Sequence, residues 1–289
     1  MPERRSRASR TAEMVAYIRH LSHLEPEPGL RNPDDLASIF LAPVTRLLVR
    51  PRALWTWLCR TFGRGGMEYH LVRTRHVDAI LEAALRDGLE QLVLLGAGYD
   101  SRPYRFRAAL REVAIFELDL PATQARKKAC LARHFGAVPE HVTFVPIDFD
   151  RETIPDRLLD AGYDPARRTL FNWEGVSMFL EAEAVDGVLR LVAERSGPGS
   201  AIVFDYLLRS VLDGDLTPLG SRRMLKLCQR VGEALSFGLP GEDATASYLA
   251  ARGLEVVSDL GTEELVERYL PSRDHPVLGA LRIVHARRP

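Results

Sequence analysis

Short apolar runs alternate with amphipathic helical segments through most of the chain from residue 67 onward. The run from Leu92 to Leu95 is too short for a buried helix and ends at a glycine, so we predict a strand buried on both faces. Similar runs predict seven strands, at 91–95, 113–118, 142–147, 168–173, 201–205, 254–260 and 281–286. Helices are predicted near 103–111, 121–135, 152–161, 181–195, 243–252 and 262–270. Strands that alternate with helices predict an α/β fold with a seven-stranded, mostly parallel sheet.

Two regions depart from this alternation. Residues 1–66 carry helical spacing and no strand signal, so we predict an N-terminal arm and helical cap there. Residues 67–289 are predicted to form one Rossmann-like domain that begins with a long helix at 68–87. After the fifth strand, 207–240 is predicted as a helical insertion that lies over the strand ends and forms part of a lid.

The first strand leads directly into a glycine turn. Gly96-Ala97-Gly98 lets the backbone turn sharply and lets a ligand approach without a Cβ in the way. Asp100 and Ser101 follow as N-cap residues for the next helix. A strand, a glycine turn and a helix N-terminus form the nucleotide-binding corner of doubly wound α/β sheets, although a lone G-x-G is also common in plain turns.

The ligand expected at this corner is a nucleoside without a phosphate. The third glycine of the dinucleotide fingerprint, which lets a helix pack beneath a pyrophosphate, is missing after Gly98. Its absence argues against NAD or FAD and favours S-adenosyl-L-methionine (SAM). Glu117 is predicted to end the second strand, about twenty residues on, where an acidic side chain would accept hydrogen bonds from ribose hydroxyls.

Four acids are predicted at strand ends: Asp100, Glu117, Asp148 and Glu174. A single acid there is typically a helix cap, but four in series suggest a pocket that suits the cationic sulfonium of SAM. We expect Asp148 to accept from the adenine amino group and Glu174 to face the ligand ammonium. Arg73, on the long helix, is the candidate bidentate partner for the ligand carboxylate.

Composition narrows the class of protein. The chain has 289 residues, with 39 lysines and arginines against 39 acids, so no broad charge pattern for nucleic acid is present. Three widely spaced cysteines fit neither a disulfide framework nor a zinc site, and the histidines show no ligand spacing. No apolar run suggests a membrane span, and no signal peptide is recognisable, so the cytoplasm is expected.

Four motifs in this order and spacing resemble the leucine carboxyl methyltransferase family, in particular its bacterial branch of carboxyl O-methyltransferases of secondary metabolism. They are RTR (73–75), LLGAGYDSRPYR (94–105), FELDLP (116–121) with two lysines at 127–128, and WEGVSMFL (173–180). The resemblance runs from about Thr11 to Leu239 and implies a SAM-dependent methyltransferase with a helical cap, yielding S-adenosyl-L-homocysteine (SAH) as product.

The resemblance also implies residue roles. Arg73 would bind the SAM carboxylate, with Arg19 a further candidate, and Glu174 the amino group. The predicted cofactor residues are Arg73, Gly96, Ala97, Gly98, Asp100, Glu117, Leu118, Asp148, Phe149 and Glu174. Phe179 stands where many members carry tyrosine, a departure that leaves the acceptor contacts open. The predicted acceptor-pocket residues are Met178, Phe179, Tyr206 and Phe237.

A small-molecule carboxylic acid is the expected acceptor. A carboxylate has a pKa near about 4 and is already a nucleophile at neutral pH, so alignment and water exclusion replace a general base. No N-P-P-[YF] tetrad for amide or adenine nitrogen is present, and His70 and His76 lack an evident acidic partner. A hydroxyl or amine acceptor, a non-catalytic SAM-binding partner protein and a nicotinamide oxidoreductase remain alternatives.

Overall fold

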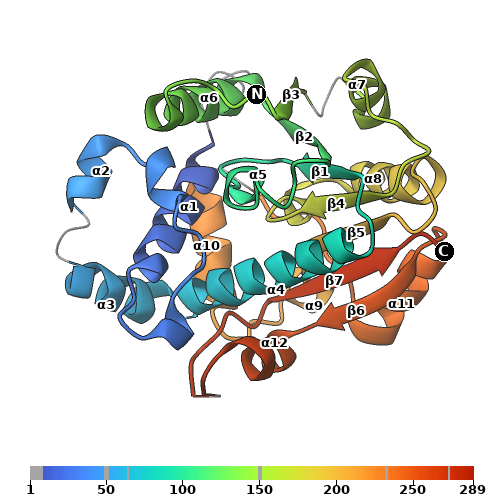
Figure 1. Ribbon diagram of the computed structural model, residues 1–289. Helices are drawn as coiled ribbons and strands as arrows, with labels where there is room; N and C mark the ends of the chain where they lie inside the picture. The colour runs from blue at the N-terminus through green and yellow to red at the C-terminus, as the bar shows by residue number, and fades with distance from the viewer. Residues whose placement is uncertain (1–8, 49–51, 64, 149–151, 232–233, 273) are drawn as a thin grey trace.

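A seven-stranded sheet forms the centre of the molecule, with helices on both faces (Figure 1). The computed structural model describes residues 9–48, 52–63, 65–148, 152–231, 234–272 and 274–289. The strand order is β3-β2-β1-β4-β5-β7-β6. The strands are β1 (Gln91–Leu95), β2 (Ala114–Asp119), β3 (Val142–Pro146), β4 (Thr169–Trp173), β5 (Ala201–Leu207), β6 (Glu255–Leu260) and β7 (Leu281–Arg287).

Strands β1 to β5 pair in parallel, whereas β7 is antiparallel to both β5 and β6. The predicted seven-stranded, mostly parallel sheet is therefore confirmed. The carboxyl ends of β1 to β5 meet along one side of the sheet, which we call the carboxyl edge. In open α/β sheets this is where ligands bind, beside the point at which the strand order reverses between β1 and β4.

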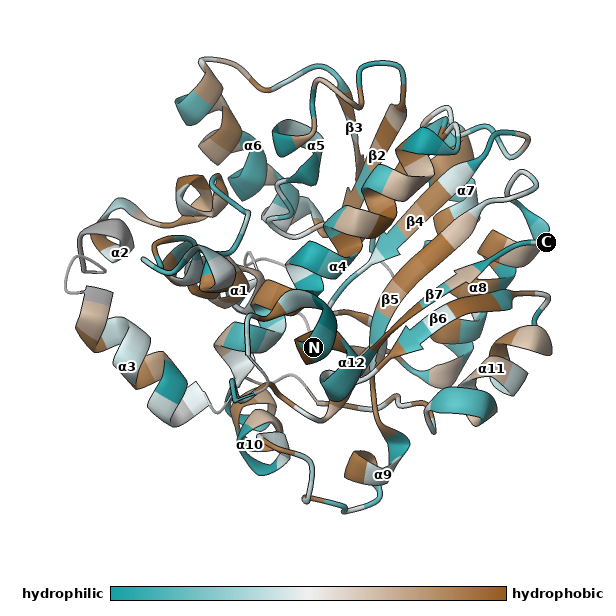
Figure 2. Ribbon diagram, turned by 60° about the horizontal axis from the view of Figure 1, so that its bottom comes forward, coloured by the Kyte–Doolittle hydropathy of each residue, from teal (hydrophilic) through white to brown (hydrophobic). Residues whose placement is uncertain are grey.

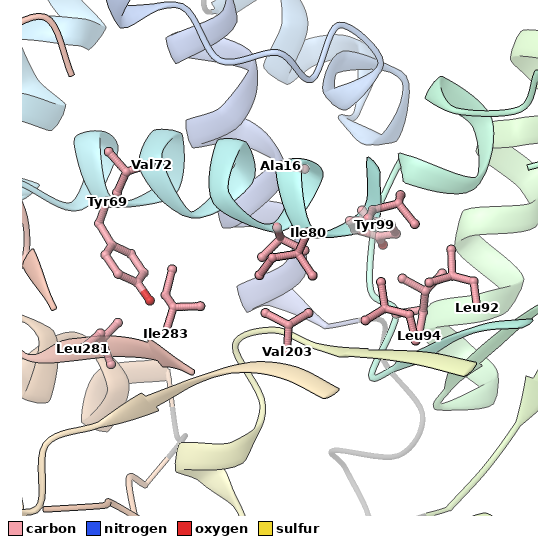
Figure 3. Packing of buried hydrophobic residues seen from close by; sticks show 14 of the residues in the cluster. Ala16, Tyr69, Val72, Ile80, Leu92, Leu94, Tyr99, Val203, Leu281 and Ile283 are labelled. Atoms are coloured by element: carbon pink, nitrogen blue, oxygen red, sulfur yellow. The ribbon is translucent and has the colours of Figure 1, made fainter. Parts of the chain in front are cut away.

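Helices cover the two faces of the sheet in separate layers. On the first face lie α4 (Gly66–Arg86), α6 (Pro121–Phe135) and α12 (Thr262–Tyr269), and on the second lie α7 (Ile154–Asp160), α8 (Ala182–Glu194) and α11 (Glu242–Ala250). Figure 3 shows Ile80 of α4 above Leu92, Leu94 and Val203 of the strands. The strands are largely apolar, while the helices show hydrophilic outer faces (Figure 2).

The alternation of side chains along each strand decides which residues can share a site. In β5, Val203 and Leu207 pack in the first-face cluster, whereas Phe204 and Tyr206 pack in the second. Asp205 therefore faces α4. In β2, Ile115 lies on the first face, so the acids at 117 and 119 also point there.

The N-terminal region is helical in its described part, as predicted. It comprises α1 (Arg10–His23), η2 (Pro28–Leu30), η3 (Ala37–Phe40), α2 (Pro43–Leu48) and α3 (Arg52–Gly63). Residues 1–8 of the predicted arm lie outside the described residues. Helix α1 packs against α4 and η3. Arg75 of α4 joins this cap to α12, because its Nη1 donates to the carbonyl oxygens of Gly29 at 2.9 Å and Tyr269 at 2.6 Å.

Three predicted elements differ from the structure. Strand β2 continues two residues beyond Glu117, to Asp119, because it pairs with β3 as far as Pro146. The helix expected at 103–111 is only α5 (Arg102–Arg105). The insertion predicted as helical over 207–240 is helical in only part of its described residues, at α9 (Arg209–Leu212) and α10 (Ser221–Val231).

Candidate active site

The glycine turn after β1 adopts the backbone that the sequence predicted. Gly96 and Gly98 have φ of 65° and 45°, in the left-handed region that favours glycine. A Cβ on Gly96 would lie 2.6 Å from Cγ2 of Val176, which is closer than packed atoms tolerate. Ala97 N donates to the Leu118 carbonyl at 2.9 Å, which ties the turn to β2. Close neighbours and backbone geometry thus both require glycine at 96.

Asp119 is the carboxylate that closes β2 beside this turn. Its Oδ2 accepts a hydrogen bond from Gly98 N at 2.6 Å, and its Oδ1 accepts one from Leu120 N at 2.6 Å. Burial raises the pKa of Asp119, and the two backbone donors oppose that rise. A carboxylate can accept about four hydrogen bonds, so this group retains acceptor capacity for ribose hydroxyls.

Glu117 occupies a different environment from the one expected at a strand end. Its side chain is fully buried, its Oε2 lies 2.7 Å from Nζ of Lys127, and its Oε1 accepts from the Tyr104 hydroxyl at 3.0 Å. Burial raises the pKa of Glu117, and Lys127 opposes that rise. The prediction that Glu117 closes the second strand is wrong, because that position belongs to Asp119.

Arg73 lies at the carboxyl edge and is held by acids from two strands. Its Nη1 lies 2.6 Å from Oδ2 of Asp205, and its Nε lies 3.1 Å from Oε2 of Glu174. Burial alone would lower the pKa of Arg73, but Asp205 and Glu174 outweigh burial and raise it. The Tyr69 hydroxyl also donates to Asp205, at 3.1 Å, and Figure 3 shows this hydroxyl directed toward the strands. Arg73 thus remains charged beside the carboxyl ends of β4 and β5.

Arg102 connects the remaining acids of this edge. Its Nη1 lies 2.6 Å from Oδ2 of Asp100 and 2.5 Å from Oε1 of Glu174, and its Nε lies 2.7 Å from Oδ1 of Asp78. Burial would raise the pKa of Asp100, but Arg102 outweighs burial, and the pKa is lowered to about 2. Asp100 and Glu174, both predicted at strand ends, are thus brought together by Arg102 and are both ion-paired.

Asn172, at the end of β4, offers an acceptor to this site. Its Nδ2 donates to Asp100 at 3.1 Å and to Glu174 at 3.0 Å. Its buried Oδ1 has no donor among the described residues. Nearby, Arg19 of α1 donates from Nη2 to the Tyr99 carbonyl at 2.7 Å, so the cap is fastened to the glycine turn.

Six other residues were predicted to line the cofactor or acceptor site. Asp148 follows β3 and is half-buried, and its N–H donates to Glu152, whereas Phe149 lies outside the described residues. Met178 is buried in the first-face cluster, and Phe179 packs against it. Tyr206 and Phe237 are buried in the second-face cluster, although Phe237 N donates to the Met178 carbonyl at 3.3 Å. The side chains of the four predicted acceptor residues are therefore divided between the two clusters.

Sequence reasoning missed three polar residues of the carboxyl edge. Asp119 and Asp205 each stand at a strand's carboxyl end, and Asn172 comes two residues before Glu174. The sequence FELD (116–119) contains two acids, Glu117 and Asp119, two residues apart. Either of them is a candidate for the last residue of β2. Asp205 ends the predicted fifth strand, 201–205, the same kind of position at which the other four acids were predicted.

Comparison with known proteins supplies the family. The sequence matches the leucine carboxyl methyltransferase family over residues 12–193. The chain belongs to this family. This membership confirms the predicted family, the enzyme class of SAM-dependent methyltransferases and, with them, the cofactor SAM.

Individual relatives are consistent with this assignment. A protein of Mycolicibacterium paratuberculosis, provisionally named as a SAM-dependent methyltransferase, is 30% identical over 269 residues, covering 88% of this chain and 82% of that protein. The Bacillus subtilis protein YktD, with the same provisional name, is 29% identical over 215 residues, covering 74% and 70%. A DUF574 family protein from Streptomyces avermitilis shares the fold at 16% identity, with a TM-score of 0.60 and 98% of each chain covered.

The residues at the carboxyl edge fit SAM. The left-handed glycine turn, the carboxylate of Asp119, the cationic Arg73 and the unpartnered Oδ1 of Asn172 match a ribose, a carboxylate and an ammonium group. Among the described residues, no group of three histidines, cysteines or acids is arranged to hold a metal ion. No helix in the described part of the chain is long and apolar enough to cross a membrane.

Proposed function

We propose that the protein transfers a methyl group from SAM to the carboxylate of a small molecule, of the kind found in secondary metabolism, and forms a methyl ester. Membership of a carboxyl methyltransferase family supports this acceptor class. The proposed location is the cytoplasm, and the proposed partner is a small-molecule acid rather than nucleic acid or a membrane. The helical cap and 207–240 would select the acceptor.

We infer that Asp119, rather than Glu117, binds the ribose. Asp119 stands at the turn, whereas the carboxylate of Glu117 is already paired with Lys127 and Tyr104. Arg73 would hold the carboxylate of the methionine end, and Glu174 with Asn172 would accept from its ammonium. When bound, SAM supplies a methyl group made electrophilic by its sulfonium.

One observation supports a carboxylate acceptor in particular. The acids nearest Arg73 are each paired with a guanidinium: Asp205 with Arg73, Asp100 with Arg102, and Glu174 with both. Both oxygens of each of these acids already accept a hydrogen bond or lie in an ion pair, so none of the three has an oxygen left to take the proton of an alcohol or phenol. A carboxylic acid is already ionised above about pH 4 and needs no base.

The test uses SAM labelled on its methyl group, with matched acceptors such as benzoate, benzyl alcohol and benzylamine. Transfer to the acid, with label released by mild base, supports the proposal, because methyl esters hydrolyse where ethers and methylamines do not. Base-stable label on the alcohol or amine, with none on the acid, would contradict it. Glu174→Gln serves as a control that should weaken SAM binding and lower transfer to every acceptor.

A further inference from the structure

His70 stands beside Arg73 at the carboxyl edge. It lies one turn before Arg73 on α4, next to Tyr69. Tyr69 and Arg73 both donate hydrogen bonds to Asp205, near the carboxyl end of β5. Asn32 of the cap donates to the His70 carbonyl at 3.4 Å. His70 therefore lies where the cap meets the strand ends, the region in which the ligand is expected.

The contact with Arg73 fixes which ring nitrogen carries the proton. Nη2 of Arg73 lies 3.2 Å from Nδ1 of His70. A guanidinium has only donors and stays protonated, so Nδ1 must be the acceptor in this hydrogen bond. The proton of the neutral ring is therefore on Nε2. Burial and the positive charges of Arg73 and Arg19 lower the pKa of His70 well below its usual value, which keeps the ring neutral.

Two donors near this point lack an acceptor. The His70 side chain is half-buried, and no described residue accepts a hydrogen bond from its Nε2. The buried Nε of Arg19, on the facing helix α1, also has no hydrogen-bond partner among the described residues. Helices α1 and α4 pack against each other. Nη1 of Arg19 already lies 3.2 Å from Oδ2 of Asp34, so Nε is the part of this guanidinium left for a ligand. N–H donors that have no acceptor suit an anion with several lone pairs, such as a carboxylate.

We propose that Nε2 of His70 donates a hydrogen bond to a ligand carboxylate bound between α1 and α4. This inference rests on the proposed function, since both the methionine end of SAM and the proposed acceptor carry a carboxylate. His70 is then a binding and positioning residue, not a base, because the nitrogen that faces the ligand already carries its proton. The two possible sources of the carboxylate are separated by experiment.

His70→Phe removes the donor, whereas His70→Gln keeps an N–H at a similar reach. Calorimetric titration would use SAH, which has the amino acid end, and 5′-methylthioadenosine, which lacks it. If the carboxylate belongs to the cofactor, His70→Phe should weaken SAH about tenfold and leave methylthioadenosine unchanged, with His70→Gln close to wild type. If it belongs to the acceptor, both affinities should stay unchanged while the KM for benzoate rises about tenfold.

Three results would overturn the inference. Equal losses of SAH and methylthioadenosine in both variants would indicate a purely structural role, and no change in any of the three quantities would remove His70 from the site. Nitrogen NMR of the SAH complex, with labelled histidine, should show a neutral ring protonated on Nε2, and an Nδ1–H ring or an imidazolium near pH 7 would contradict the hydrogen-bond assignment. Failure to methylate benzoate or any other acid would refute the proposed function alone, because the two titrations and the NMR measurement need no turnover.

Discussion

Replacing Asp119 by asparagine should show whether this acid, rather than its neighbour Glu117 in β2, binds the ribose. Asparagine keeps the shape and one acceptor oxygen, which Gly98 N can still use, as it uses Oδ2 of Asp119 at 2.6 Å. The charge and the remaining acceptor positions are lost. A hydrogen bond to a charged group contributes about 1.5–3 kcal/mol, so SAH should bind roughly 10- to 150-fold more weakly.

Glu117→Gln is the matched comparison, because both acids lie on the same strand face. Glu117 pairs with Lys127 inside the protein, at 2.7 Å, and removing one partner of a buried ion pair costs about 3–5 kcal/mol of stability. A typical domain has about 5–15 kcal/mol in total, so this variant should still fold but unfold at a lower temperature. Its affinity for SAH, once folded, should be close to wild type.

The assay is calorimetric titration with SAH at a temperature where thermal unfolding shows each variant to be folded. The expected pattern is crossed: Asp119→Asn loses affinity with a small change in melting temperature, and Glu117→Gln loses melting temperature with little change in affinity. If instead Glu117→Gln lost affinity for SAH and Asp119→Asn did not, Glu117 would be the acid that binds the ribose. Equal effects of both variants on affinity would show that the two acids act together and that the strand end alone does not define the site.

Three further outcomes follow from contacts in the structure. Gly96→Ala should abolish measurable SAM binding, because the new Cβ would lie 2.6 Å from Cγ2 of Val176 and the residue would keep a positive φ. Adding Val176→Ala relieves the contact but not the positive φ, so it should restore only part of the binding. Full SAM binding by Gly96→Ala alone would contradict this. Burial lowers the pKa of His76 to about 4, so the unfolded state binds a proton first as pH falls below about 6.5. The unfolding free energy should therefore drop by about 2 kcal/mol from about pH 7 to about pH 5 on account of this residue, a drop that denaturant titration should find missing in His76→Gln. Tyr206→Phe breaks the 2.6 Å hydrogen bond to Asp259 and should cost about 1–3 kcal/mol of stability with no change in the acceptor KM, whereas a raised KM would place Tyr206 in the acceptor site.

The strands and the glycine turn were predictable because both depend on local sequence. An apolar run such as Leu92–Leu95 is short, ends at glycine and can only be a buried strand, and the left-handed turn at Gly96 needs no tertiary information. The family followed from motifs that surround this turn. These features were enough to predict the α/β fold and the cofactor SAM.

The end of β2 was not predictable to the residue, because pairing with the neighbouring strand decides it. Asp119 pairs with Pro146 of β3, so the ladder continues two residues past Glu117. Acids two residues apart point to the same face, so the alternation does not distinguish Glu117 from Asp119. Only the position of Lys127, one helix later, shows which of the two is buried in an ion pair.

The placement of Tyr206 was not predictable for a related reason. A strand buried on both faces is apolar at every position, so its sequence does not reveal which side chains face the ligand. In β5, Phe204 and Tyr206 pack on the second face, and only Asp205 between them reaches Arg73. In this strand the polar residue, Asp205, indicated the side that faces the site, whereas the aromatic residue Tyr206 did not.

The ion pairs of the carboxyl edge also explain how a buried site can accept a zwitterionic ligand. Arg73 and Glu174 lie 3.1 Å apart and are both largely buried, so separating them without compensation would expose two charges to a medium of low polarity. The methionine end of SAM carries one carboxylate and one ammonium, the same two charges. Binding it between the pair would replace one ion pair by two, with the carboxylate on Arg73 and the ammonium on Glu174, and would leave no charge unpaired. A nucleoside without the amino acid end offers no such exchange, which is why titrations with SAH and 5′-methylthioadenosine can isolate the contribution of this part of the site.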